Sequence, residues 1–282
     1  MTSASVIADS SHKNSRITTF ELEYPRFIHG EFMTHRLFSR NAASSRAIPI
    51  KKMQKQVWSE PAMPVAWGKN QSGMQADHDL GPVAKWFARK IWRLGGKLAV
   101  LTSKALSSTG LHKQLANRVL EPWQLMKVVV TATEFENFFW LRDHEDAQPE
   151  IAALAIVMQQ AMTHSEPKAL KVGEWHLPYD EENLFSLDER KVVSVSGCAQ
   201  VSYRTLDLSR AKAKKICDML VDGQRVHASP FEHQATPISQ TGENPLKTKG
   251  VTHCDVDGNL WSGNFKGWIQ HRQLIKGHVK NG

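Results

Sequence analysis

Residues 17–49 of this 282-residue chain constrain its fold most, because a strand pattern, a helix pattern and a cationic loop follow one another there. The segment ITTFELEY (17–24) alternates and is rich in β-branched and aromatic residues, which predicts a strand. Pro25 can begin a helix, and apolar residues recur four apart in RFIHGEFMTHRLFS. We expect this helix to fray into RNAASSR and to end before Pro49.

Strand and helix patterns alternate along the rest of the chain. We therefore expect an α/β (α+β) fold, with a central mixed or antiparallel sheet flanked by helices. The segments 126–135 and 191–203 are strand-like, and 208–223 is an amphipathic helix. A long helical pattern after residue 135 is expected to kink or restart at Pro149.

Three further stretches complete the expected organisation. Residues 1–16 are polar, and we expect a flexible N-terminal tail. Residues 58–82 hold much of the Pro and Gly and are expected to form an irregular insert. Residues 83–108 have helical spacing that predicts a core-facing stripe of Trp86, Ile91, Leu94, Leu98 and Leu101.

The composition is that of a globular protein, with 41% hydrophobic and 23% charged residues. We find no apolar run of about 18 residues and no signal-peptide pattern, which favours a cytoplasmic protein without a membrane partner. The net charge of +8 favours anionic partners. Because the cations are spread along the chain, small phosphorylated ligands are favoured over nucleic acid. Three distant cysteines indicate neither a disulfide framework nor a metal site.

The loop FMTHRLFSRNAASSRAIP (32–49) crowds cations and hydroxyl groups beside apolar residues. Ser44, Arg46 and free backbone N–H groups could together bind an anion, with His35 and Arg36 near the helix end. A surface loop whose arginines cap carbonyl groups is the alternative interpretation.

Arg142 follows the aromatic run NFFWL, so its guanidinium should be partly buried and should need an acceptor. A bound ligand could supply that acceptor, and so could a salt bridge with Glu136, Asp143 or Asp146. The segment HASPFEH (227–233) is a dense polar cluster, although a simple turn would also explain it.

We find no nucleophile with an obvious partner. Cys198 lies in a stretch of small residues without a neighbouring base, so we interpret it as a core residue. If the chain is an enzyme, a cofactor should carry the difficult step.

Three segments together resemble the flavin-dependent thymidylate synthases. That family's signature is Arg-His-Arg, seven residues, Ser, one residue and Arg. Here THRLFSRNAASSR gives His35-Arg36, Ser44 and Arg46 at this spacing, with Thr34 in place of the first Arg. The segment NFFWLRDHEDAQPEI is similar to the family's N-F-L-x-L-R followed by A-Q and an acidic helix. AQVSY and HASPFEH are similar to A-R-V-S-F and H-E-T-P-F-E-H.

The order of these segments differs from that of the family. The last two precede the signature in the family and follow it here, so the chain looks circularly permuted. Residues 190–275 would then match the family's N-terminal segment within a single catalytic domain, 17–282. A second pair, His271-Arg272, lies in a stretch (266–275) that echoes residues 30–39. It lacks the following Ser and Arg, so we expect it to be a structural remnant or to serve a second surface.

The resemblance implies a function. The family transfers a one-carbon unit from 5,10-methylenetetrahydrofolate to C5 of dUMP, with FAD reduced by NADPH and without a cysteine nucleophile. FAD binds at subunit interfaces of a homotetramer. A hydroxymethyl product, action on dCMP, and a non-catalytic nucleotide- or nucleic-acid-binding relative are the alternatives.

The resemblance also implies roles for individual residues. The flavin would contact His35, Arg36, Leu37, Asn137, Ser202, Ser229 and Glu232. The substrate nucleotide would contact Glu31, Ser44, Ser45, Arg46, Arg118 and Arg142, with guanidinium groups on its phosphate and Arg142 on a pyrimidine carbonyl. Arg142, Ser44 and His227 are the expected catalytic residues.

Several positions depart from the family pattern. Thr34, Ala42, Ala47, Thr131, Thr133 and Asp146 replace Arg, Glu, Tyr, Asn, Arg and His, respectively. Glu31 stands where the family has Gln. A carboxylate can accept a hydrogen bond from an exocyclic amine, so Glu31 would favour a cytosine over a uracil nucleotide.

Overall fold

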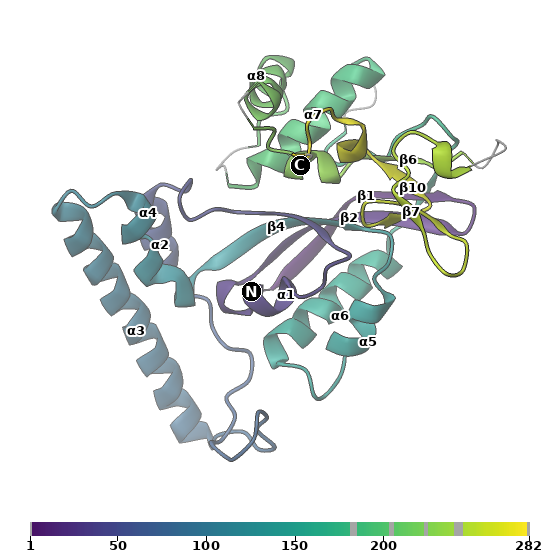
Figure 1. Ribbon diagram of the computed structural model, residues 1–282. Helices are drawn as coiled ribbons and strands as arrows, with labels where there is room; N and C mark the ends of the chain where they lie inside the picture. The colour runs from purple at the N-terminus through teal and green to yellow at the C-terminus, as the bar shows by residue number, and fades with distance from the viewer. Residues whose placement is uncertain (1, 181–184, 203–205, 223–224, 240–244, 281–282) are drawn as a thin grey trace.

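The computed structural model describes residues 2–180, 185–202, 206–222, 225–239 and 245–280. Five strands form a mixed sheet in the order β3-β4-β2-β1-β5 (Figure 1). Strand β5 is parallel to β1, and the other neighbouring pairs are antiparallel. The predicted central mixed sheet flanked by helices is confirmed. The strands are β1 (Ser3–His12), β2 (Ser15–Pro25), β3 (Ser39–Ala42), β4 (Leu125–Ala132) and β5 (Lys168–Ala169).

The prediction of a flexible tail at residues 1–16 is wrong. Strand β1 pairs with β2 from Ser3↔Glu23 to His12↔Ser15, across a turn in which Lys13 has φ 51°. Arg16 donates hydrogen bonds to both carboxylate oxygens of Asp9, which joins the two strands further. Backbone pairing orders this polar segment although it has few apolar side chains to bury.

The predicted helix after Pro25 is much shorter than its pattern suggested. A 3₁₀ turn (Arg26–Ile28) leads into α1 (His29–Phe32), and the chain then turns and forms β3 instead of fraying. The edge of β4 pairs with β3 along its length. Phe38 packs in the core, with its ring 5.1 Å from that of Phe135. Pairing of β3 with the edge of β4 therefore outweighs local helix preference here.

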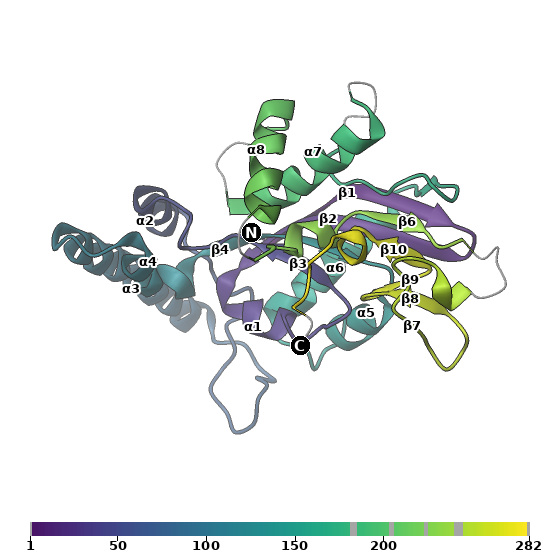
Figure 2. The same cartoon turned by 45° about the horizontal axis from the view of Figure 1, so that its top comes forward.

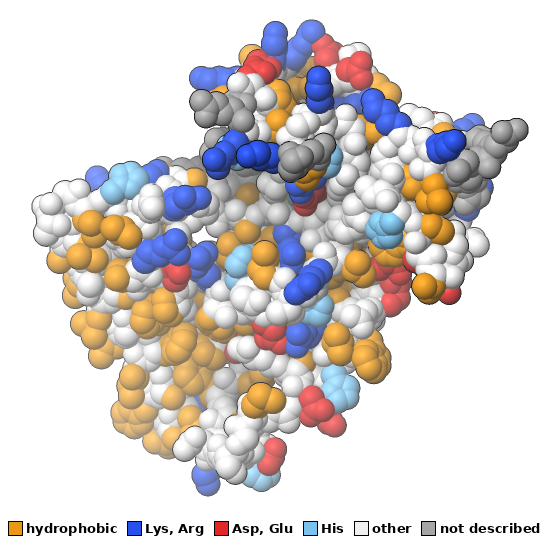
Figure 3. All heavy atoms as spheres, viewed as in Figure 1, with side chains coloured by type: hydrophobic (Ala, Val, Ile, Leu, Met, Phe, Trp, Pro, Cys, Tyr) orange, Lys and Arg blue, Asp and Glu red, His pale blue; other side chains and the backbone are white. Residues whose placement is uncertain are grey.

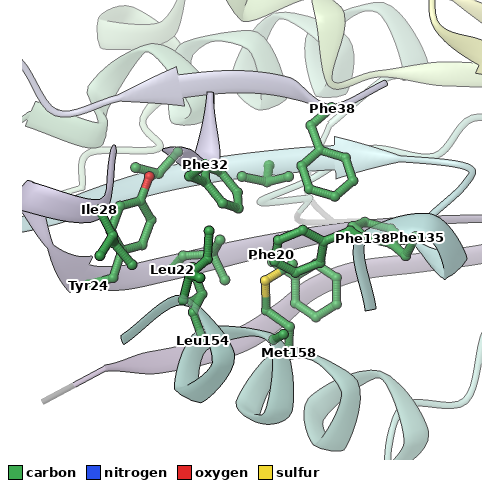
Figure 4. Packing of buried hydrophobic residues seen from close by; sticks show 14 of the residues in the cluster. Phe20, Leu22, Tyr24, Ile28, Phe32, Phe38, Phe135, Phe138, Leu154 and Met158 are labelled. Atoms are coloured by element: carbon green, nitrogen blue, oxygen red, sulfur yellow. The ribbon is translucent and has the colours of Figure 1, made fainter. Parts of the chain in front are cut away.

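Helices α5 (Glu136–Arg142) and α6 (Pro149–Thr163) cover one face of the sheet, and the predicted restart at Pro149 is confirmed. Alternate residues of β2 point at α6 and fill the main core. Figure 4 shows this packing, which includes Phe20, Leu22, Tyr24, Ile28, Phe32, Phe38, Phe135, Phe138, Leu154 and Met158.

A helical arm projects from the sheet on one side (Figure 1). It contains α2 (Ile50–Ser59), α3 (Pro82–Ser108), α4 (Lys113–Ala116) and a 3₁₀ helix (Arg118–Trp123). The helix predicted over 83–108 is confirmed. Of the irregular insert predicted over 58–82, residues 60–81 contain no helix, whereas Trp58 and Ser59 end α2 and Pro82 begins α3.

The apolar stripe predicted to be the core-facing side of α3 is exposed instead. Gly95 and Gly96 face the body of the protein, where an added Cβ would come within 2.9 and 3.2 Å of the Trp123 ring. These glycines allow close packing beside Trp92 and Val100, which also face the body, and the large side chains of the predicted stripe point outward. Hydrophobic side chains gather over the arm in Figure 3. On α3 the exposed ones are Val83, Trp86, Phe87, Ile91, Leu94, Leu98 and Leu101, each at least 52% exposed.

The strand predicted over 191–203 is also wrong, because these residues lie mainly in α7 (Leu187–Ala199). Ser186 and Glu189 form a reciprocal capping box that begins the helix. Gly197 allows Tyr179 to pack at its surface, and Cys198 is buried as expected. A 3₁₀ turn (Gln200–Ser202) and α8 (Arg210–Val221) follow, the latter confirming the amphipathic helix.

The C-terminal part lies beside the β1–β2 hairpin (Figure 2). It holds 3₁₀ helices at Ser229–Glu232, Pro245–Lys247 and His271–Leu274, and strands β6 (Ala235–Pro237), β7 (His253–Cys254), β8 (Leu260–Ser262), β9 (Phe265–Lys266) and β10 (Trp268–Gln270). Trp268 donates its indole N–H to Ser15 Oγ at 2.9 Å. The two stretches containing His-Arg differ in structure: one is α1 with a turn, and the other is β10 with a 3₁₀ helix.

No helix within the described ranges is both long and apolar enough to cross a membrane.

Candidate functional site

A basic hollow of about 230 Å³ lies at the end of β3. Ser44, Ser45 and Arg46 of the loop after β3 line it together with Arg118, more than 70 residues later in the sequence. These are four of the residues predicted to bind the substrate nucleotide. Arg26 and His29, which the sequence analysis missed, also line it.

Asn117 fixes the loop that forms this hollow. Its buried Nδ2 donates to the carbonyl oxygens of Ser45 at 2.7 Å and Ile48 at 3.2 Å. Arg118 is the next residue, so one short segment both shapes the loop and supplies a cation. An amide directly before a predicted phosphate-binding Arg was the available sequence signal.

The lining of the hollow holds several donors, and two of its arginines share one carboxylate outside the lining. Glu121 Oε1 lies 3.1 Å from both Arg26 and Arg118. His29 bonds Tyr24 Oη at 2.8 Å, and burial, with Arg26 and Arg40 nearby, lowers the pKa of His29 to about 4. The imidazole is therefore neutral at pH 7, and the three arginines carry the positive charge. Such a set of donors suits a small anion.

A second set of predicted residues meets at Arg142. Its Nη1 lies 2.5 Å from Glu31 Oε1, and its Nε donates to His35 Nε2 at 3.0 Å. The carboxylate partner of Arg142 is therefore Glu31, rather than Glu136, Asp143 or Asp146. Burial, followed by Arg142 and Arg40, lowers the pKa of His35 to about 4, so neutral His35 can accept this bond.

Glu31 and Arg142 open onto a separate hollow of about 1,050 Å³. The rest of its wall comes from the irregular insert and from the turn between α5 and α6. Glu150 joins these parts, because its Oε1 accepts the backbone N–H of Val65 at 2.9 Å.

A third hollow, of about 380 Å³, brings together Ser202, His227 and Ser229. Arg40 and Ala42 of β3 form its opposite wall. Ser202 Oγ accepts the backbone N–H of Ser44 at 2.8 Å, and Ala42 also lines the basic hollow. The two hollows are thus neighbours that share Ala42 in their walls. The family pattern has a Glu at this position.

Some predicted residues do not meet. Asn137 lies exposed on α5, and Arg36 and Leu37 lie in the exposed turn before β3. The three predicted catalytic residues, Arg142, Ser44 and His227, line three different hollows.

The second His-Arg pair has a structural use. Arg272 forms an ion pair with Glu232, a predicted flavin contact. His271 packs between the rings of Trp175 and Phe231. This fits a structural remnant, the first of the two roles that the sequence left open.

Three of the departures from the family pattern also have structural uses. Thr131 Oγ1 bonds Thr19 at 2.7 Å and His233 at 2.8 Å. Thr133 accepts the backbone N–H of Lys266 at 2.9 Å, and Asp146 accepts a bond from Gln75 at 2.9 Å.

Several buried polar atoms without a hydrogen-bond partner lie close in sequence to Glu232 or to its ion-pair partner Arg272. Within the described residues these atoms are His233 Nε2, Gln234 Oε1, Thr236 Oγ1, His271 Nδ1, Arg272 Nε and His278 Nδ1, and Asn117 Oδ1 is a further such atom elsewhere in the chain. Burying such atoms unpaired is costly, and none of their residues lines one of the three hollows. The polar side chains that line the third hollow, among them Arg40, Ser202, His227 and Ser229, fit the polar ring edge and the phosphates of a flavin.

The sequence profile of the family described as thymidylate synthase complementing protein matches residues 14–168, more than half of the chain. The chain belongs to this family, that of the flavin-dependent thymidylate synthases which its motifs resemble. The match confirms an enzyme with thymidylate synthase-like chemistry, a one-carbon transfer to C5 of a pyrimidine nucleotide. It ends before AQVSY and HASPFEH, so the circular permutation stays a prediction.

Two solved structures are similar to this one. The UMP/dUMP methylase PolB from Streptomyces cacaoi, bound with 5-Br UMP, has a TM-score of 0.48 and 16% identity, over 58% of this chain and 89% of that chain. The same methylase bound with 5-Br dUMP has a TM-score of 0.42 and 20% identity, over 52% and 67%. A search of curated proteins gives no significant match.

Proposed function

We propose that this protein uses FAD, NADPH and 5,10-methylenetetrahydrofolate to convert dUMP to dTMP, in the cytoplasm. The observation that carries the proposal is the meeting of Ser44, Ser45, Arg46 and Arg118 in one basic hollow. Family membership gives the reaction class, and this hollow supplies a place for the phosphate of a nucleotide.

The basic hollow would hold the substrate phosphate. Guanidinium groups form paired hydrogen bonds with phosphate oxygens, and the Ser44 hydroxyl adds a further donor. Arg26 and Arg118 both form ion pairs with Glu121 Oε1. These two cations are therefore already close together before a ligand binds.

Arg142 would bind the pyrimidine through a carbonyl oxygen. Its Nε and Nη1 are held by His35 and Glu31, which fixes the plane of the guanidinium. Because Glu31 is already paired with Arg142, we favour dUMP over dCMP. Tighter binding of dCMP, together with a reversal of that preference in Glu31→Gln, would favour the cytosine nucleotide instead.

The third hollow would hold part of the flavin, with Ser202, His227 and Ser229 as contacts and Glu232 behind them. A bound flavin supplies the redox chemistry that turns the transferred one-carbon group into a methyl group. The protein's own side chains would orient the flavin and the nucleotide and exclude water from between them.

We further propose that the active site is completed by a second copy of the chain. The hollow at Arg142 and the basic hollow share no lining residue, although one nucleotide should reach both groups. A site assembled between subunits would bring them together. Following the family resemblance, the assembly would be a homotetramer.

The exposed stripe of α3 would be covered by that second copy. Phe87, Ile91, Leu94, Leu98 and Leu101 alternate at spacings of four and three, the pattern by which paired helices interlock. The lysines that flank the α3 stripe can turn away from such an interface. Lys97 and Lys104 do so, with their Nζ atoms 5.3 and 5.5 Å from the centre of the Trp58 ring.

An absorbance spectrum of the purified protein with FAD, followed by titration with dUMP and dCMP, tests the proposal. We expect a bound-flavin spectrum that shifts with dUMP, and dTMP formation once folate and NADPH are added. Arg118→Gln should weaken dUMP binding about tenfold while leaving FAD binding unchanged. Arg210→Gln, at an exposed arginine paired with Glu189, is the matched control. Failure to take up flavin with or without nucleotide would overturn the proposal.

A further inference from the structure

Arg40 is a half-buried arginine to which neither the sequence nor the family pattern gives a role. Its Nη1 donates to the carbonyl oxygens of Phe32 at 3.4 Å, Met33 at 3.0 Å and His35 at 3.1 Å. The guanidinium is therefore fixed against the end of α1. In the part of the chain that is described, its Nε and Nη2 have no hydrogen-bond partner and no carboxylate lies within ion-pair distance.

Arg40 also lines the third hollow, opposite Ser202, His227 and Ser229. The described lining of this hollow contains no acidic side chain. Burial of the guanidinium is costly, and Glu232 attracts it only from beyond ion-pair distance. The remaining N–H groups of Arg40 form a fork that matches an oxyanion. The wall around Arg40 thus has the charge and the donors of an anion site.

The position of Arg40 relates to one departure from the family pattern. Thr34 stands where that pattern has an arginine, and its hydroxyl donates to the carbonyl of Glu31 at 2.7 Å. Arg40 bonds the carbonyl groups on either side of Thr34, those of Met33 and His35. A guanidinium from β3 therefore lies beside the position from which one is missing.

We propose that Arg40 binds a phosphoryl group of the ligand in the third hollow, in place of the arginine missing at position 34. The inference rests on the proposed function. The phosphoryl group could belong to FAD or to the nucleotide substrate. The neighbouring Ser202, His227 and Ser229 favour the pyrophosphate of FAD.

The test compares the wild type, Arg40→Gln, and Arg40→Gln combined with Thr34→Arg, with Arg210→Gln as control. Three probes are used: FAD by flavin fluorescence, dUMP by calorimetry, and pyrophosphate by the rise in Tm that it causes. We expect Arg40→Gln to lower the affinity for FAD at least tenfold and to abolish the rise with pyrophosphate. Thr34→Arg should restore both. The same loss for dUMP instead of FAD would assign the phosphoryl group to the substrate.

Two results would overturn the inference. One is binding of all three probes by Arg40→Gln within about twofold of the wild type. The other is a loss of binding that accompanies a lower Tm and is not restored by Thr34→Arg, because Arg40 would then act by holding α1. If the wild type binds neither FAD nor dUMP, the proposed function fails. The inference about Arg40 is then tested by pyrophosphate alone, and a wild-type Tm that does not rise with pyrophosphate would overturn it.

Discussion

Strand β2 and helix α3 carry equally apolar side chains in opposite surroundings. Phe20 of β2 is fully buried between the sheet and α6, whereas Phe87 of α3 is 55% exposed. The β2 side chains stabilise the folded chain itself. Those of the exposed α3 stripe contribute little to it, because the helix packs on the body with its other face, which includes Trp92, Gly96 and Val100. The apolar face of α3 is thus available to another surface.

Helix α3 and the sheet region also differ in their charged and titratable residues. Helix α3 carries six of the chain's lysine and arginine residues and no acidic residue, against a net charge of +8 for the whole chain. The sheet and its covering segments hold buried histidines instead, including His176 and His233. The two regions should therefore respond differently to substitution, to pH and to salt.

Leu98→Glu should have the largest effect, on assembly and activity together. A charge in the middle of the α3 stripe would oppose its burial against a second copy, so we expect smaller particles by light scattering and loss of dTMP formation. The Tm at high dilution should change little, because Leu98 is 54% exposed. Arg89→Glu, two residues from Phe87 and so on the far side of the helix, is the control. An unchanged particle mass in Leu98→Glu would end the proposal that a second copy covers α3.

Phe20→Ala and Phe87→Ala make a matched pair for stability. Removing the buried ring should lower the free energy of unfolding by about 3–5 kcal/mol. Removing the exposed ring should lower it by less than about 1 kcal/mol in the dissociated chain. Urea unfolding at low protein concentration measures both. Similar losses for the two variants would show that α3 is part of the folding core.

Acid should act on the sheet region and not on α3. Burial lowers the pKa of His176 to about 3, whereas the unfolded value is about 6.5. Between these values the unfolded chain binds more protons, so the stabilising contribution is complete above about pH 6.5 and is lost as the pH falls toward 3. The loss should be on the order of 3 kcal/mol at pH 4.

Urea titrations at pH 7 and pH 4 on His176→Gln and the wild type measure this contribution. The variant should lose less stability than the wild type on acidification, and His253→Gln, at an exposed histidine, should behave as the wild type does. Equal losses in all three proteins would assign the acid sensitivity to other groups.

Trp58→Leu should have the smallest effect. The ring of Trp58 lies beneath Lys97 and Lys104, and such contacts contribute roughly 0.5–1 kcal/mol at exposed sites. We expect a loss of this size in thermal unfolding. If these contacts hold the lysines away from the stripe, self-association should also become more sensitive to salt.

Much of the fold could be predicted from local sequence. The strands at β2 and β4, the helix α8 and the restart at Pro149 follow from side-chain period and from the backbone chemistry of proline. The ordering of β1, the shortening of α1 and the helix α7 could not be predicted in the same way. The ordering of β1 depends on its pairing with β2, and the shortening of α1 depends on Phe38 entering the core as β3 pairs with β4. Helix α7 depends on its capping box and on the close packing of Tyr179 at Gly197.

The candidate site divides in the same way. The signature spacing indicated Ser44 and Arg46, and the fold brings them to Arg118. The contributions of Arg26, His29 and Arg40 could not be predicted, because each acts through a neighbour that is distant in sequence or shaped by a turn.

By itself, the sequence determined the family, the main sheet strands and the residue types of the proposed chemistry, because these depend on spacing along the chain. Only the tertiary structure decided that Glu31 is the partner of Arg142, that Arg40 faces the third hollow, and that the apolar stripe of α3 is exposed. Helical or strand period shows that apolar side chains share one face, but which face is buried depends on what packs against it.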